Sequence, residues 1–309
     1  MNDSLQVSVV IPVFNEELVL HELYPRLKKE AESWGKSYEL LFVDDGSTDN
    51  SFELMCKWKK RDSKIRIVKF TRNFGQQAAV LAGFRKSRGD IVVQIDSDLQ
   101  NPPEEIKRLL SAFTDEIDLV VTIPRKRRDS FLRVLGSKVL YSLAQALFGN
   151  RFKLNLSSFR AMRKSVIEKI DQCQDRSRYM AVLMSWIAVP TVELEVEHHL
   201  RTTGQTKYGF LPLLRLSWDL ITGYSNFPLR LVTYLGLLGA SMGFAIMIFL
   251  LYQRLVSGIL IEGFVVLSAV FSFFAGVQLM SIGFLGEYLG RVHMQIQNRP
   301  DYILHKVID

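Results

Sequence analysis

The sequence predicts an α/β domain with a parallel, helix-covered sheet, followed by two membrane-spanning helices. Short runs rich in Val and Ile alternate with helical patterns along the N-terminal half, which is typical of parallel strands that are buried on both faces and joined by helices. Two uncharged stretches follow, Leu231 to Gln253 and Gly263 to Gly286. Each reaches the roughly 20 residues needed to cross about 30 Å of hydrocarbon.

Five buried strands are expected in the N-terminal half, each ending in polar or turn-forming residues. They are Val7 to Val13, Leu40 to Val43, Ile65 to Phe70, Ile91 to Ile95 and Leu119 to Ile123. A further strand is expected at Thr191 to Glu197, where strict alternation predicts one buried and one wet face.

The composition indicates that part of the chain lies in lipid. Of its 309 residues 48% are hydrophobic, and the mean hydropathy of +0.10 is high for a soluble protein. The net charge of +7 is compatible with nucleic acid, anionic lipid or a phosphorylated ligand. Because the basic residues gather beside apolar segments and no nucleic-acid motif is present, we expect lipid and phosphate as partners and no nucleic acid.

Several protein classes are disfavoured by what the motifs lack. The first turn, Pro12 to Glu16, has no glycine, so a dinucleotide-binding Rossmann site is not expected, and a Walker-type phosphate loop is absent as well. Cys56 and Cys173 are far apart and have no metal-ligand spacing, which favours free thiols in a reducing compartment. Met1 to Leu5 lacks the start of a cleavable signal peptide, so the first domain is expected in the cytoplasm.

A pair of acids follows the fourth predicted strand. Asp96 and Asp98 stand where this strand ends, and Pro102-Pro103-Glu104-Glu105 then begins a helix. Ligands of open α/β sheets bind at the carboxyl ends of the strands, and paired carboxylates there suit Mg²⁺ or Mn²⁺ on a diphosphate. The alternative is a solvated turn whose acids cap the helix.

Polar loops also follow the second and third strands. Asp44 or Asp45 can accept hydrogen bonds from a nucleobase and a ribose, or can belong to a capped loop before the next helix. In the later loop, Gly75 allows a ligand to approach the backbone closely, and Arg72 can neutralise phosphate.

A basic amphipathic helix is expected near residues 128–148. Its apolar stripe runs from Phe131 to Leu147, and Arg125-Lys126-Arg127-Arg128 precedes it. Such a helix can lie in the membrane interface, or it can pack on the sheet as an ordinary helix.

The motifs together resemble a known family. Asp96-Ser97-Asp98-Leu99-Gln100-Asn101-Pro102-Pro103-Glu104 resembles the signature of the polyprenyl-phosphate glycosyltransferases, relatives of dolichol-phosphate mannose synthase among the inverting GT-A enzymes of family 2. This family includes bactoprenol glucosyltransferases and undecaprenyl-phosphate aminoarabinose transferases. Three more of its motifs occur in order, at Val9 to Glu16, Val43 to Asp49 and Thr71 to Gly75, so the resemblance covers nearly the whole chain.

The resemblance implies roles for residues on the donor side. Asp96, Asp98 and Gln100 would hold Mg²⁺ or Mn²⁺ on the donor diphosphate, and Asp96, Asp98 and Arg201 would be catalytic. Arg201 and Lys207 belong to an Arg-x-x-Gly-x-Thr-Lys-Tyr loop that closes over the diphosphate in the family. The remaining expected donor-binding residues are Pro12, Phe14, Glu16, Asp44, Asp45, Arg72 and Gly75.

The acceptor side matches the family with one departure. The expected acceptor-phosphate residues are Arg125, Arg133, Ser137, Ser157, Ser158 and Arg160. Relatives carry an aspartate shortly before the last arginine, whereas Leu154 to Arg160 contains no carboxylate. We therefore expect no general base from this segment. A phosphate monoester has a second pKa of about 6 and is already anionic at neutral pH, so it needs positioning more than deprotonation.

The expected domains are a GT-A domain at 1–206, a juxtamembrane segment at 207–229, two transmembrane helices within 230–290 and a cytoplasmic tail at 291–309. Basic residues at the outer ends of the two spans place both termini in the cytoplasm of a multi-pass plasma (inner) membrane protein. These basic residues are Arg230, Arg291, Arg299 and Lys306. Gly236, Gly239 and Gly243 either allow close helix contacts, including those of a homo-oligomer, or face lipid.

The function expected from the resemblance is inverting transfer of one sugar from a nucleotide sugar, UDP-linked, to undecaprenyl phosphate at the cytoplasmic membrane face. GDP-mannose or an aminoarabinose-type donor is the nearest alternative. A processive polysaccharide synthase would carry a Gln-x-x-Arg-Trp motif and more spans, which the sequence lacks. A non-catalytic, membrane-anchored nucleotide-sugar sensor is the remaining alternative, because the segment before Arg160 lacks the aspartate of the relatives. A sensor would bind the donor without turning it over.

Overall fold

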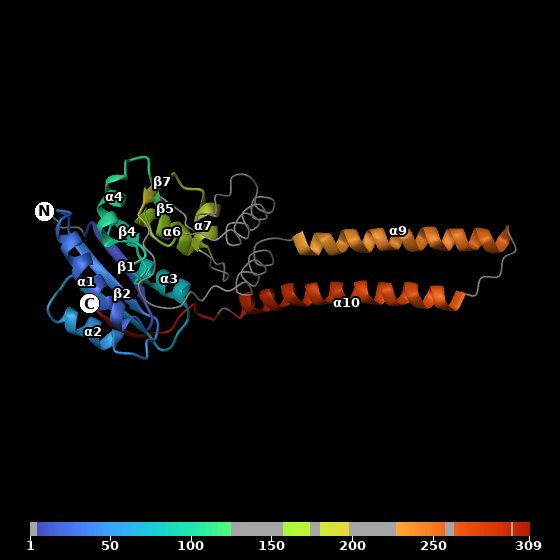
Figure 1. Ribbon diagram of the computed structural model, residues 1–309, viewed down its shortest axis with the longest axis horizontal. Helices are drawn as coiled ribbons and strands as arrows, with labels where there is room; N and C mark the ends of the chain where they lie inside the picture. The colour runs from blue at the N-terminus through green and yellow to red at the C-terminus, as the bar shows by residue number, and fades with distance from the viewer. Residues whose placement is uncertain (1–4, 125–156, 174–179, 198–226, 257–262, 298) are drawn as a thin grey trace. The chain divides into compact units, whose positions relative to one another are not determined.

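The computed structural model describes residues 5–124, 157–173, 180–197, 227–256, 263–297 and 299–309. The chain forms two compact units. One holds the N-terminal α/β region and takes in Pro300–Asp309, and the other holds the two long helices, α9 Phe227–Leu255 and α10 Gly263–Ile296 (Figure 1).

Within the described residues, eight strands form one sheet in the order β7-β5-β6-β4-β1-β2-β3-β8. The strands are β1 Val7–Val13, β2 Tyr38–Asp44, β3 Ile65–Phe70, β4 Ile91–Gln94, β5 Leu119–Pro124, β6 Arg160–Arg163, β7 Thr191–Val196 and β8 Leu304–Ile308. All five strands expected in the N-terminal half are present, and β7 is exposed on alternate residues as its pattern predicts.

The sheet is mixed, and the expectation of an all-parallel sheet is therefore wrong in part. β4, β1, β2 and β3 are parallel neighbours, and β5 and β7 form another parallel pair. β6 runs antiparallel between β4 and β5, and β8 runs antiparallel along β3. Both exceptions are short strands with charged residues, so no long apolar run marks them in the sequence.

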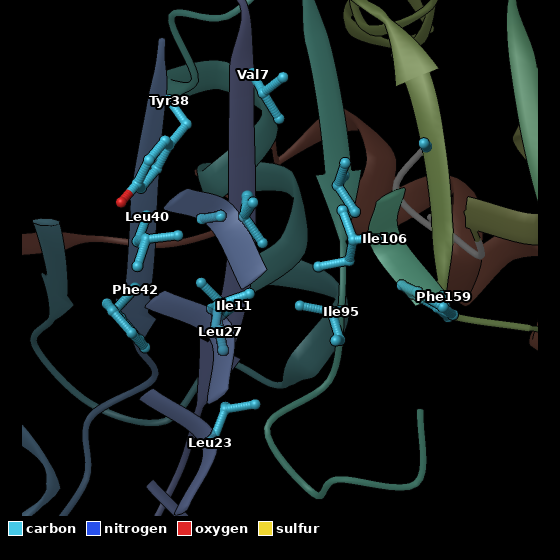
Figure 2. Packing of buried hydrophobic residues seen from close by; sticks show 14 of the residues in the cluster. Val7, Ile11, Leu23, Leu27, Tyr38, Leu40, Phe42, Ile95, Ile106 and Phe159 are labelled. Carbon is cyan, nitrogen blue, oxygen red and sulfur yellow. The ribbon is translucent and has the colours of Figure 1, made fainter. Parts of the chain in front are cut away.

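Helices cover both faces of the sheet. They are α1 Glu17–Glu32, α2 Ser51–Lys59, α3 Gln76–Lys86, the 3₁₀ turn η1 Pro103–Glu105, α4 Ile106–Ser111, α6 Lys164–Gln172 and α7 Met180–Ile187. Leu23 and Leu27 of α1 share one buried cluster with Ile11, and Figure 2 shows these side chains beside the strands. Val10 points to the opposite face and belongs to a second cluster with Phe84 of α3. Burial of both faces explains the continuous apolar runs of the central strands.

Helix α3 approaches the sheet closely at Gly83. A Cβ atom at this position would lie 2.2 Å from Cγ1 of Val10 on β1. Any larger residue would therefore push apart the helix and the strand.

The second unit contains α9, Phe227–Leu255, and α10, Gly263–Ile296. In the described part of the chain, Leu229–Phe249 is the span that is long and apolar enough to cross a membrane. A Cβ on Gly239 or Gly243 of α9 would lie 3.1 or 3.4 Å from the Phe274 ring of α10, whereas Gly236 faces open space. Two of the three glycines therefore let the two helices approach each other.

The residues after α10 return to the α/β unit. A cytoplasmic tail is expected at 291–309, and Leu304–Ile308 of this segment form β8 in the sheet. Asp309, directly after β8, accepts a hydrogen bond from Nε of the buried Arg66 on β3 over 2.7 Å and lies 3.1 Å from the Arg88 guanidinium. These ion pairs attach the end of β8 to its neighbours in the α/β unit.

Candidate donor and cation site

The candidate site lies at one edge of the sheet. The parallel strands β4, β1, β2 and β3 all run in the same direction, so the loops that follow them gather at their carboxyl ends, where open α/β sheets bind ligands. The polar motifs expected to bind the donor and the cation are found in or next to these loops.

Asp96 lies just beyond β4 and is held by two neutral donors. Nε2 of Gln76 donates to Oδ1 over 2.7 Å, and the Ser158 hydroxyl donates to Oδ2. Burial raises the pKa of the Asp96 carboxyl, and the negative charge of Asp98 raises it further, against the hydrogen bonds and the positive charge of Arg160. A divalent cation would stabilise two carboxylates placed together in this way.

Asp98 begins a tight turn that brings Gln100 back toward it. Oδ1 of Asp98 accepts a hydrogen bond from the N–H of Gln100 over 3.1 Å, and Leu99 between them has a left-handed φ of 59°. No group of three His, Cys, Asp or Glu side chains suited to a metal occurs among the described residues. The donor set of two carboxylates and one amide fits Mg²⁺ or Mn²⁺ in a site that substrate phosphate oxygens complete.

The segment from Ser157 to Arg160 lies beside the acid pair. The Ser158 hydroxyl reaches Asp96, while the Ser157 hydroxyl lies 2.7 Å from that of Thr122 on β5. A serine hydroxyl has a single O–H donor, so Ser158 can donate to a ligand only when it no longer donates to Asp96.

Arg160 is a buried cation next to this segment. It begins β6 opposite Gln94, and its Nη1 donates to the sulfur of Met184 over 2.9 Å. Its Nε has no hydrogen-bond partner in the described structure. Burial lowers the pKa of Arg160 to about 10, against the charge of Asp96, so the guanidinium is still positive at neutral pH. The cation and its unused donor are suited to an anionic ligand.

The two acids after β2 have different partners. Asp44 is fully buried, and its Oδ1 accepts the N–H of Ser47 over 3.0 Å while Lys69 lies 3.7 Å from Oδ2. Asp45 accepts the N–H groups of Phe74 and Gly75 over 2.7 and 2.9 Å. Burial raises the pKa of Asp45, and these two bonds lower it. Asp45 therefore holds the loop after β3.

This loop presents Arg72 at the surface. Its guanidinium lies 4.1 Å over the Phe74 ring, and Gly75, with a φ of 98°, leads directly into α3. Gly46 allows the preceding loop to approach, because a Cβ there would lie 2.5 Å from the carbonyl carbon of Arg72. The loops that follow β2 and β3 are thus in direct contact.

The remaining donor-side residues lie at the start of the chain. Pro12 is in β1, Phe14 is 38% exposed, and Glu16 directly precedes α1. Asn15 between them accepts the N–H of Thr48 over 2.8 Å, which joins this turn to the loop after β2. Five expected site residues lie outside the described residues, as does the helix expected near 128–148; these residues are Arg125, Arg133, Ser137, Arg201 and Lys207.

Sequence reasoning missed three contributors to this edge. Gln76 contacts Asp96, Asn15 joins two loops, and Thr122 contacts Ser157. The position of Gln76 directly after Gly75 is a usable signal, because that residue begins the helix at the carboxyl edge. Thr122 gives no such signal, since it lies within an apolar strand.

A mixed sheet with an acid pair at the carboxyl edge of its parallel strands is the arrangement expected of a GT-A glycosyltransferase domain. The profile of Glycosyl transferase family 2 matches residues 8–171. The chain belongs to this family and is a glycosyltransferase.

Relatives are similar along nearly the whole chain. The undecaprenyl-phosphate 4-deoxy-4-formamido-L-arabinose transferase of Aeromonas hydrophila is 40% identical over 98% of this chain and 94% of its own length. The enzyme of the same name from Salmonella paratyphi B has the same identity and coverage. A crystal structure of glucosyl-3-phosphoglycerate synthase from Mycobacterium tuberculosis with Mn²⁺ and UDP-glucose is 21% identical, with a TM-score of 0.48 over 71% of this chain and 77% of that chain.

Proposed function

We propose that this chain transfers a single sugar, with inversion, from a UDP-linked donor to undecaprenyl phosphate at the cytoplasmic face of the plasma (inner) membrane. The observation that carries the proposal is the 40% identity to undecaprenyl-phosphate formamidoarabinose transferases over 98% of the chain. Because this identity includes the helices as well as the α/β unit, it favours a lipid-linked acceptor. Among donors it favours a 4-formamido-pentose over glucose or mannose.

On the donor side, Asp96, Asp98 and Gln100 are the residues that would hold Mg²⁺ or Mn²⁺. When bound, the cation stabilises the negative charge that grows on the departing nucleotide diphosphate. Gln76 and Ser158 orient the Asp96 carboxylate for cation binding through their hydrogen bonds. Arg72, held on a loop that Asp45 fixes, supplies a further positive charge to the diphosphate.

On the acceptor side, the lipid phosphate attacks the anomeric carbon as an anion. Its second pKa of about 6 leaves it mostly deprotonated at neutral pH, and residues 154–160 contain no carboxylate that could act as a base. Arg160 supplies a buried positive charge beside the acid pair. Its contribution is to attract and orient the phosphate, which places the attacking oxygen near the sugar.

The two-helix anchor is supported by the pairing of β3 with β8. β3 precedes both long helices and β8 follows them, yet they are hydrogen-bonded neighbours. The two strands must therefore lie on the same side of a membrane. A chain that crosses with Leu229–Phe249 has to cross back before Leu304. We assign the return to α10, which leaves the sheet and both termini on one side of the membrane. The basic residues at the outer ends of the two spans favour the cytoplasmic side.

The test is a transfer assay with the full chain in detergent. The protein is incubated with undecaprenyl phosphate, MnCl₂ or MgCl₂, and labelled UDP-4-formamido-arabinose, UDP-glucose or GDP-mannose, and the lipid product is identified by mass spectrometry. We expect a product from the UDP-linked formamido sugar. A product from GDP-mannose alone would refute the proposed donor, and binding of a nucleotide sugar without any product would favour a sensor.

A further inference from the structure

The segment that follows α10 contacts the loop that carries Arg72. β8 pairs with β3, with Leu304 opposite Phe70. This contact continues beyond the strands, because the N–H of Thr71 donates to the carbonyl oxygen of Ile303 over 3.1 Å. Thr71 is the first residue of the loop, so the backbone after α10 fixes the point where the loop leaves the sheet.

Aromatic rings continue this contact to the guanidinium. The Tyr302 ring stacks on Phe70, with centroids 4.9 Å apart and planes inclined by 7°. Phe70 meets Phe74 edge to face at 5.8 Å, and the Arg72 guanidinium lies over Phe74. Tyr302, Phe70 and Phe74 thus form a series of three contacting rings. The last ring lies under the guanidinium of Arg72, which is expected to bind the donor diphosphate.

The Tyr302 segment is itself attached to α3. Arg85 of α3 forms ion pairs with Asp171, at 2.6 Å, and with Asp301, the residue before Tyr302, at 3.5 Å. Because α3 begins directly after Gly75, the same helix bounds the loop and holds the Tyr302 segment through Asp301. The loop is therefore fixed by Asp45 through two of its N–H groups and by the Tyr302 segment through Thr71 and the rings.

We propose that Tyr302 is a positioning residue for the donor diphosphate, which it serves by holding Arg72 in place through Phe70 and Phe74. The inference rests on the proposed function, in which Arg72 binds the donor. Without the Tyr302 ring, the face of Phe70 loses its partner and the Phe70–Phe74 pair can shift, and the guanidinium shifts with it. The segment that leads out of α10 is then part of the donor site as well as of the sheet.

The experiment compares Tyr302→Ala, Tyr302→Phe and Val307→Ala in the full chain in detergent. Tyr302→Phe keeps the stack and removes only the hydroxyl, and Val307→Ala trims β8 opposite Val68, away from the loop. Affinity is measured by calorimetry with UDP and with GDP, each with MnCl₂, and loop order by hydrogen exchange. We expect Tyr302→Ala to weaken nucleotide binding roughly three- to tenfold, as the loss of a ring pair implies. It should also speed exchange at Thr71 to Gly75 and leave the KM for undecaprenyl phosphate unchanged.

Tyr302→Phe and Val307→Ala should both bind nucleotide like the wild type. Unchanged nucleotide affinity in Tyr302→Ala would overturn the inference. An equal loss in Val307→Ala would also overturn it, since the effect would then come from a weakened strand. If the wild-type protein bound neither UDP nor GDP, the proposed function would fail first and the inference with it, an outcome distinct from selective failure of the variant comparison.

Discussion

Asp98 offers the most direct test of the cation site at the scale of a single residue. Asp98→Asn removes a charge while keeping nearly the same shape, so we expect transfer to fall about 100-fold or more, with the thermal unfolding midpoint nearly unchanged. Sugar transfer at saturating MnCl₂ and thermal unfolding are measured together. Asp118→Asn is the matched control, because Asp118 precedes β5, at the amino end of that strand, and pairs with Arg163 at 3.7 Å. Near-wild-type transfer by Asp98→Asn would show that Asp98 is not a ligand of the cation.

Substitution of Ser158 distinguishes two possible roles of this residue, contact with the acceptor phosphate and orientation of Asp96. Its family position suggests contact with the acceptor phosphate, whereas its hydroxyl donates to Asp96. Since residues that orient a metal ligand affect metal affinity, Ser158→Ala should raise the Mn²⁺ concentration for half-maximal rate roughly tenfold. Ser157→Ala, whose hydroxyl contacts Thr122 instead, should not. A higher KM for undecaprenyl phosphate at an unchanged Mn²⁺ requirement would instead assign Ser158 to the acceptor.

The acid pair and its turn were predictable from sequence because strand, carboxylates and helix start are contiguous. The contact of Ser158 with Asp96 was not, because the two residues are 62 positions apart and meet only when β6 returns beside β4. Asp45 shows the same limit. Its pattern marks a polar loop after a strand, but only the fold shows that both carboxylate oxygens are used by the backbone of another loop.

At the scale of elements, strands with long apolar runs were predictable and strands without them were not. β1 to β5 are buried on both faces, and strands without solvent contact have continuous apolar sequences that are easy to recognise. β6 has arginine at both ends, and β8 is a short edge strand with polar residues. Their places depend on hydrogen bonds to neighbours distant in sequence, which local patterns do not record.

The contact between α3 and β1 predicts an unusual result for a helix substitution. Ala at an exposed helix position stabilises by about 1 kcal/mol relative to Gly, but Gly83→Ala places a carbon against Val10. We expect a net loss of roughly 1–2 kcal/mol in the free energy of unfolding, measured by denaturant titration of the full chain. If the clash is the cause, adding Val10→Ala should cost less than the sum of the two single changes. Full additivity would contradict the proposed clash.

At the scale of the whole molecule, the attachment of β8 should depend on pH. Hydrogen bonding from Arg66 lowers the pKa of Asp309 below its ordinary value of 3.8. The unfolded chain therefore binds a proton more readily than the folded chain, and the stabilisation is present above pH 3.8 and lost as pH falls through the folded pKa. Asp309→Asn should lower the unfolding midpoint by roughly 1–3 °C at pH 6.

The difference between Asp309→Asn and the wild type should shrink as pH falls below 3.8, where the carboxylate of the unfolded wild-type chain takes up a proton, and should vanish once the folded carboxylate is protonated at its lower pKa. Thermal unfolding of both proteins across pH 3 to 6 measures it. A difference that grew at lower pH would show that the carboxylate does not stabilise the folded state through its charge.

The pairing of β3 with β8 also sets the order in which the protein can be completed. β3 is made early, but its outer edge stays unpaired until both long helices have been synthesised and residues 304–308 follow. During this interval the nascent chain displays a row of free N–H and C=O groups, which other strands can pair with. The β8 strand of a neighbouring copy fits that edge as well as its own, so strand exchange between newly made chains is the misassembly that this architecture favours.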